Sequence, residues 1–228
     1  MPGLVAPRQA RSHRSLESMV AALEHLLRDR PFEEISVAEI CRSANVTTGA
    51  FYARFQAKDS LMPYVYERYQ AWLSHSIPAQ FDRVDWQRCS PRPAAEKIAQ
   101  VLIALYAERP WLLRAVTLFA RSGRGNMAAH SGQASRDLVH AMKRVLELHF
   151  VVDTENAHRA LDFALFALIS TAREAVLFPS APVASVAGKW QEPTLSRQLG
   201  ALLTGHLLAE GVEMRAPKKK TRSVQGGT

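Results

Sequence analysis

Cysteine is scarce in this sequence, whose 228 residues include only Cys41 and Cys89. Cys41 lies on the apolar side of an expected helix and Cys89 in a proline-bounded segment, so the two do not form the framework of a disulfide-stabilised secreted domain. The basic residues between Met1 and Ser15 are not followed by an apolar run with a cleavage site, so no secretory signal is visible. These absences predict a reduced, cytoplasmic protein.

Long apolar runs are also missing. The most apolar stretch, residues 160–172, is interrupted by Asp162 and is shorter than the roughly 20 residues that a membrane-spanning helix needs. We therefore expect no membrane partner.

No stretch alternates apolar and polar residues as a half-buried strand does, whereas apolar residues recur at helical spacing along most of the chain. The sequence thus predicts an all-α fold.

Catalytic motifs are absent as well. The sequence contains no HExxH, GxSxG, P-loop or strand-linked GxGxxG pattern, so we expect neither enzymatic activity nor a cofactor. Glu155, His158 and Asp162 have the best spacing for metal ligands, but surface side chains produce this pattern far more often, and we predict no metal.

Positive charge, in contrast, is in excess. A formal net charge of +8 suits a nucleic acid or another anionic surface.

Residues 35–58 contain the pattern of two short helices joined by a tight turn. Ser36 followed three residues later by Glu39 predicts a capping box at the start of the first helix. Asn45 falls in the turn, where it tolerates the left-handed backbone conformation that such a turn needs. Thr47 is placed to cap the second helix. Two capped helices across a turn predict a helix-turn-helix.

The second of these helices has two different sides. Phe51 and Phe55 are four residues apart and are expected to point inward. The outward-facing residues are Thr47, Thr48, Tyr52 and Ala53, and the hydroxyl groups among them suit base edges and phosphates.

The stretch from about residue 14 to residue 68 resembles the DNA-binding domain of TetR-type transcriptional regulators. The residues that carry the resemblance are Ser36, Ile40, Ala44, Val46, Thr47, Gly49, Tyr52, Phe55, Lys58 and Leu61. Asn45 stands where the family prefers glycine, which is a mild chemical departure. The resemblance implies that six positions contact DNA: Ser36, Thr47, Thr48, Gly49, Tyr52 and Lys58.

The resemblance also implies about nine helices in two domains. Residues 1–58 would form a three-helix DNA-binding domain with a basic N-terminal arm up to Arg14. Residues 59–228 would form a larger helical ligand-binding and dimerisation domain with a basic tail at residues 218–222. The helical spacing and the breakers predict helices at residues 15–28, 58–76, 94–107, 111–119, 135–150, 154–178 and 195–210, with a loop at residues 77–93.

Two sets of residues in the larger domain follow from this reading. A ligand cavity, implied by the resemblance, could be lined by Tyr106, Trp111, Phe119, Met142, Phe163, Phe166 and Arg173. The last two helices of each subunit are implied to form a four-helix dimer interface, with candidate residues Phe166, Ile169, Leu199, Leu202, Leu203 and His206.

Together these observations predict a homodimeric, sequence-specific regulator that binds a double-stranded DNA operator. We expect it to be a repressor that a small-molecule effector of unknown identity releases from a palindromic site. Two alternatives stay open: a helical ligand-binding or enzymatic bundle that keeps the helix-turn-helix as a scaffold, and a basic protein of membrane surfaces. Retention of a specific DNA sequence would separate the first reading from both alternatives.

Overall fold

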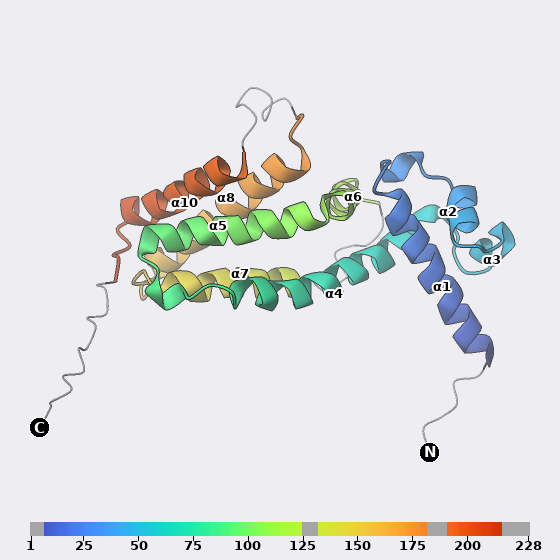
Figure 1. Ribbon diagram of the computed structural model, residues 1–228, viewed down its shortest axis with the longest axis horizontal. Helices are drawn as coiled ribbons and strands as arrows, with labels where there is room; N and C mark the ends of the chain where they lie inside the picture. Colours follow the sequence, from blue (N-terminus) through green and yellow to red (C-terminus); the bar gives the residue numbers. More distant parts are fainter. Residues whose placement is uncertain (1–6, 125–131, 182–190, 216–228) are drawn as a thin grey trace, which may run out of the picture. The chain divides into compact units, whose positions relative to one another are not determined.

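The computed structural model describes residues 7–124, 132–181 and 191–215 (Figure 1). These residues form nine α-helices: α1 (Pro7–Leu26), α2 (Val37–Ser43), α3 (Thr48–Tyr52), α4 (Met62–Phe81), α5 (Pro91–Glu108), α6 (Pro110–Arg121), α7 (Gln133–Glu147), α8 (Glu155–Leu177) and α10 (Glu192–Ala209). Three short 3₁₀ helices lie between them: η1 (Phe32–Glu34), η2 (Lys58–Leu61) and η3 (Trp86–Arg88). The described ranges contain no strand, only an isolated antiparallel bridge between Phe150 and Met214. The predicted all-α fold is confirmed.

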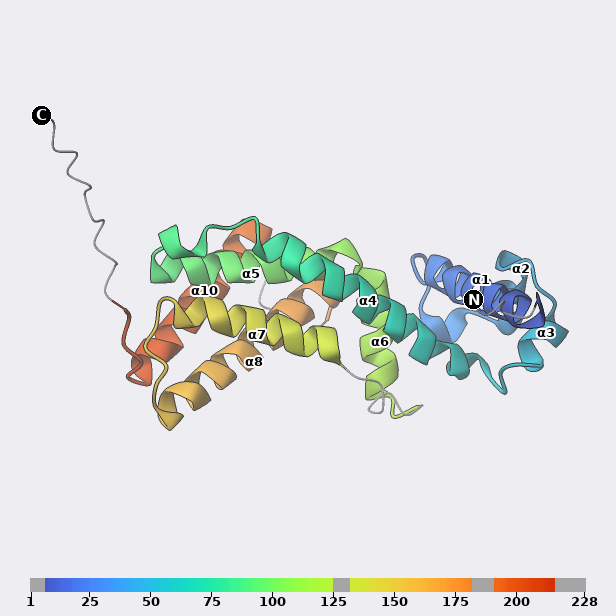
Figure 2. The ribbon, with the colours of Figure 1, turned by 90° about the horizontal axis from the view of Figure 1, so that it is seen from below.

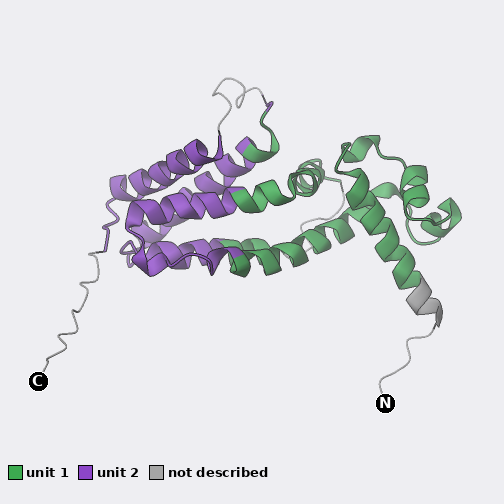
Figure 3. Ribbon diagram, in the orientation of Figure 1, with its two compact units in different colours: residues 1–79, 104–138, 176–179 green, residues 80–103, 139–175, 180–228 purple. Residues whose placement is uncertain are grey.

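The chain divides into two compact units (Figure 3). Unit 1 comprises residues 1–79, 104–138 and 176–179, and unit 2 comprises residues 80–103, 139–175 and 180–228. Unit 1 therefore includes the predicted DNA-binding segment together with most of α4 and all of α6. Within the described ranges, no helix combines the length and the apolar character needed to cross a bilayer.

Helix α1 contributes apolar side chains to the core of unit 1. Val20, Leu23 and Leu27 are buried, as their helical spacing predicts. Leu16, predicted on the same side, is only half-buried, whereas Met19 is buried. The helix begins at Pro7, well before the predicted start at Ser15, so the prediction of an unstructured arm up to Arg14 was wrong. Proline is favoured at the first position of a helix, and no breaker follows it. The predicted basic tail at residues 218–222 lies outside the described residues.

The predicted bounds of α4 and of the loop after it were wrong, and prolines lie at each of these places. The chain makes the 3₁₀ turn η2 first, and α4 then begins at Met62, so Pro63 lies in the first helical turn, where its missing N–H removes no helical hydrogen bond. The predicted loop at residues 77–93 was wrong at both ends. Helix α4 continues through the exposed Pro78 to Phe81, and α5 begins at Pro91.

Unit 2 is built from parts of α5, α7 and α8 and from α10. Lys143 on α7 forms an ion pair with Asp162 on α8, and Figure 2 shows these two helices side by side. Helix α10 approaches α5 very closely at Gly200, where an added Cβ would lie 2.7 Å from the Cα atom of Glu96. Only a residue without a side chain fits at this crossing.

Candidate nucleic-acid interface

Helix α2 begins with the predicted capping box. The Glu39 backbone N–H donates to Ser36 Oγ at 3.2 Å, and the Ser36 backbone N–H donates to Glu39 Oε2 at 2.8 Å. Arg30 Nη2 lies 2.8 Å from Glu39 Oε1. Hydrogen bonds from the Ser36 backbone and hydroxyl and from Arg30 lower the pKa of Glu39 from 4.5 to about 2. The capping box thus uses a carboxylate that stays ionised well into acid.

The turn after α2 has the geometry that the sequence predicts. Asn45 has φ of 54°, and it is the only non-glycine residue with positive φ among those described. The Val46 backbone N–H donates to the Cys41 carbonyl at 2.9 Å, which closes the turn. This turn orients α3 relative to α2.

Helix α3 presents one polar side to solvent. Thr47 caps it by accepting the Ala50 N–H at 3.1 Å, and Phe51 and Phe55 are buried at 0% and 5% exposure. The opposite side is exposed, with Tyr52 at 59%. Five of the six predicted contact positions are therefore accessible: Ser36, Thr47, Thr48, Gly49 and Tyr52.

Lys58, the sixth predicted position, lies differently. Its Nζ atom is 2.6 Å from the carbonyl oxygen of Phe32 and 2.7 Å from that of Ile35, with the Glu33 carbonyl at 3.3 Å. The ammonium group also sits 4.4 Å from the centre of the Phe32 ring. Its hydrogen-bond donors are therefore directed at the protein's own backbone.

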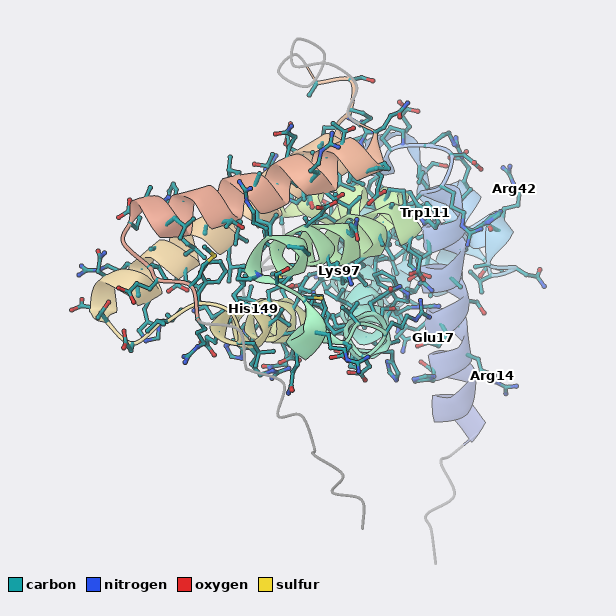
Figure 4. All side chains as sticks on the ribbon, turned by 60° about the vertical axis from the view of Figure 1, so that its left-hand side comes forward. Arg14, Glu17, Arg42, Lys97, Trp111 and His149 are labelled. Atoms are coloured by element: carbon teal, nitrogen blue, oxygen red, sulfur yellow. The ribbon has the colours of Figure 1, made fainter. Side chains whose placement is uncertain are left out.

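Two arginines near this surface were missed by the sequence analysis. Arg54 donates to the carbonyl and the hydroxyl of Ser12 at 2.6 and 2.9 Å, which ties the end of α3 to α1. Arg42 lies exposed in the last turn of α2, and Figure 4 shows its side chain pointing outward from the helix. Arg42 could have been identified from the sequence, because basic residues are favoured in the last turn of a helix. The contact of Arg54 with Ser12 could not, because it depends on the tertiary fold.

The residues predicted to line a ligand cavity differ in their burial and in their neighbours. Trp111, labelled in Figure 4, lines a surface pocket of about 190 Å³ between α6 and residues 27–33, with Arg28 lying 5.1 Å above its ring. Phe119 is instead a core residue, 1% exposed, with its ring edge-on to Phe32 at 5.6 Å. Tyr106 and Met142 are buried, and Arg173 is half-buried.

Phe163 and Phe166 are 59% and 67% exposed on the surface of α8 in the single chain, whereas the sequence analysis expects them to line a cavity. Helical spacing alone made α8 look buried on more than one side. The described part of the chain also holds no cluster of three metal-ligating side chains.

The predicted dimer residues divide between core and surface. Leu199 and Leu203 are 3% and 0% exposed, so they are core residues of the single subunit. Leu202, on the other side of α10, is 52% exposed, and Ile169 and His206 are partly exposed. The rings of Phe163 and His206 are in contact, with centroids 5.1 Å apart. We call the exposed residues Phe163, Phe166 and Leu202 the α8/α10 face.

Comparison with known proteins agrees with this geometry. Residues 20–65 match the family described as bacterial regulatory proteins, tetR family. Over 104 residues the chain is 31% identical to YwcC of Bacillus subtilis (strain 168), described as an uncharacterized HTH-type transcriptional regulator. This match covers 45% of the present chain and 47% of YwcC, so it spans about half the length of that relative.

Solved structures share the fold over most of the chain. A TetR transcriptional regulator from Rhodococcus sp. RHA1 has a TM-score of 0.54 at 16% identity, covering 87% of this chain and 98% of that one. The fatty acid degradation regulator FadR from Bacillus halodurans has a TM-score of 0.53 at 14% identity, covering 89% and 98%. At such low identities the likeness concerns the fold alone.

Proposed function

We propose that this chain, whose residues 20–65 match the tetR family of bacterial regulatory proteins, is a homodimeric transcriptional regulator that binds double-stranded DNA. Residues 1–58 would bind DNA, and residues 59–228 would bind an effector and form the dimer. In its simplest form the protein is a repressor that occupies a palindromic operator until a small molecule releases it.

The observation that carries this proposal is the polar outer side of α3. Buried Phe51 and Phe55 and the Thr47 cap fix which side of this short helix faces solvent. That side carries two threonines, a glycine and a tyrosine hydroxyl, which can approach base edges and phosphates closely. If the helix-turn-helix were only a scaffold, this polar side of α3 would have no function.

Dimerisation is supported by the α8/α10 face. Phe163, Phe166 and Leu202 are all more than half exposed in the single chain. Large apolar side chains grouped on one surface usually mark an interface, and a two-fold contact would bury each of them twice. We therefore propose that Phe166, Ile169, Leu202 and His206 contribute to the interface.

Release by an effector requires two conformations that bind the effector with different affinity. The residues predicted to bind it all remain candidates: Tyr106, Trp111, Phe119, Met142, Phe163, Phe166 and Arg173. The pocket beside Trp111 adjoins residues 27–33, which lead into the DNA-binding helices. A ligand there would act on the connection between α6 and α2.

Selection of bound sequences from a random pool of double-stranded DNA tests the proposal. We expect a palindrome to be enriched, with half-site centres about 34–36 Å apart, one helical turn of DNA. An enriched single half-site would argue against the dimer. No enrichment above background, from a folded protein at moderate salt, would overturn DNA binding and favour the scaffold alternative.

A further inference from the structure

The short helix η1 connects α1 to the DNA-binding helices and is held from two sides. It runs from Phe32 to Glu34 and is followed directly by Ile35 and by Ser36, the N-cap of α2. Any shift of η1 therefore moves the start of α2, and through the turn at Asn45 it moves α3.

Lys58 holds the first side. An ammonium group has three N–H donors and no acceptor. Three backbone carbonyls, those of Phe32, Glu33 and Ile35, converge on Lys58 Nζ at 2.6, 3.3 and 2.7 Å. Burial lowers the pKa of Lys58, and nearby Asp59 and Glu33 oppose that shift. The Lys58 side chain thus satisfies these three carbonyl groups and holds them together.

Arg124, just beyond α6, holds the second side. Its Nη2 atom lies 2.5 Å from Glu33 Oε1, and its Nη1 atom lies 3.9 Å from Asp59 Oδ2. Its guanidinium also stacks 5.5 Å from the Phe119 ring, which itself packs edge-on against Phe32. A buried aromatic pair and an exposed ion pair therefore link α6 to η1.

We infer that Lys58 is a positioning residue for α2 and α3, and not a phosphate contact. With Arg124 it clamps η1 between the start of η2 and the end of α6, and the clamp sets where α3 meets the DNA groove. This inference rests on the proposed DNA-binding function. It replaces the role that the resemblance implies for Lys58.

Arginine at position 58 separates the two roles. Arginine binds phosphates at least as well as lysine does, so Lys58→Arg would preserve a phosphate contact. Its planar guanidinium cannot direct three donors from one nitrogen atom at three converging carbonyls. Lys58→Met keeps most of the packing on Phe32 and removes only the hydrogen bonds and the charge. Lys97→Met removes one exposed charge from α5 and serves as the matched control.

Binding is measured with the full-length protein on the duplex that the wild type enriches and on a scrambled duplex of equal length, with the active fraction determined by titration. For Lys58→Met and Lys58→Arg alike, we expect the Kd for the enriched duplex to rise roughly tenfold to a hundredfold, the range that charge-assisted hydrogen bonds contribute. The Kd for scrambled DNA and the salt slope should stay as in the wild type. Arg124→Ala should shift the specific Kd in the same direction, but by less.

A phosphate contact gives the opposite pattern. The slope of log K against log salt would fall by about 0.9 in Lys58→Met, both duplexes would weaken together, and Lys58→Arg would restore binding. That result would overturn the inference. A lower active fraction of the variant protein, with an unchanged Kd for the enriched duplex, would also overturn it. Such a result would mean that Lys58 serves folding in general.

Hydrogen exchange without DNA keeps the inference testable on its own. Amides of residues 32–43 should exchange faster in both Lys58 variants, whereas those of α8 and α10 should be unchanged. If the wild type enriches no DNA, the proposed function fails, and the exchange data still decide whether the clamp exists. Unchanged exchange at residues 32–43 would show that Lys58 holds nothing.

Discussion

At the scale of single residues, the side chains of α3 divide into those that hold the helix and those that face outward. Phe51 and Phe55 hold it, whereas Thr48 is exposed and has no part in the cap that Thr47 makes. Thr48 is therefore free to read a base through its hydroxyl or its methyl group.

Thr48→Ala tests base reading. We expect a loss of about 1–3 kcal/mol on the enriched duplex and a smaller loss on duplexes altered at one base position, because the interaction lost belongs to that position. Tyr52→Phe removes only a hydroxyl, and it should weaken all sequences about equally if that hydroxyl meets a phosphate. Filter binding or fluorescence anisotropy over a panel of single-base variants distinguishes the two. A uniform loss for Thr48→Ala would place it on the backbone instead.

The capping box gives a prediction about pH. Hydrogen bonds from Ser36 and Arg30 depress the pKa of Glu39 to about 2, below the ordinary 4.5. A depressed carboxyl pKa stabilises the fold at all pH values above 4.5, and this contribution disappears as the pH falls from 4.5 towards 2. Glu39→Gln should therefore be less stable than the wild type at pH 7, and the two should converge near pH 2. Urea unfolding at several pH values measures this. A constant difference down to pH 2 would contradict the assignment.

At the scale of elements, the packing of α10 on α5 depends on Gly200. A Cβ at this position would lie 2.7 Å from backbone atoms of Glu96, and these backbone atoms cannot turn aside as a flexible side chain could. The two helices would have to separate. This crossing helps position α10, which carries part of the α8/α10 face.

Gly200→Ala is expected to lower the free energy of unfolding by about 1–3 kcal/mol, the usual cost of overpacking. Gly205 provides the control on the same helix, because a Cβ there meets nothing within 4 Å of this subunit. Gly205→Ala should leave stability unchanged or raise it by up to about 1 kcal/mol through its better helix propensity. Denaturant unfolding of both variants measures the difference. Equal effects from the two substitutions would show that α5 and α10 do not pack this closely.

At the scale of the whole molecule, the proposed dimer, and with it operator binding, would depend on the α8/α10 face. Leu202 is 52% exposed, whereas its helical neighbours Leu199 and Leu203 are already buried within the subunit. Substitution of Leu202 therefore tests the interface without emptying the core.

In the proposed dimer, Leu202→Asp would bury two carboxylates at the interface, which costs roughly several kcal/mol unless they become protonated or the dimer dissociates. We expect a monomer in sedimentation at micromolar concentration, with the helical circular dichroism retained and operator affinity lost. Leu148→Asp, at a residue 45% exposed after α7, should remain dimeric. A Leu202→Asp protein that sediments as a dimer would move the interface elsewhere.

Much of the DNA-binding region is determined by the sequence itself, since its contacts are local. The Ser36 cap, the Asn45 turn and the Thr47 cap all join residues within five positions, and each is where the pattern predicts it. The spacing of Phe51 and Phe55 likewise fixes which side of α3 faces solvent. Such contacts are readable because a helix brings only near neighbours in sequence together.

The tertiary structure decided everything that joins distant segments. The type of residue 58 suggests a phosphate contact, but its ammonium group meets carbonyls more than twenty positions earlier in the chain. Helical spacing grouped Leu199, Leu202 and Leu203 as one stripe, and only the packing of α10 shows that two are buried and one is exposed. The need for Gly200 likewise follows from its approach to Glu96. Periodicity shows which residues share a face, but what covers that face depends on the rest of the fold.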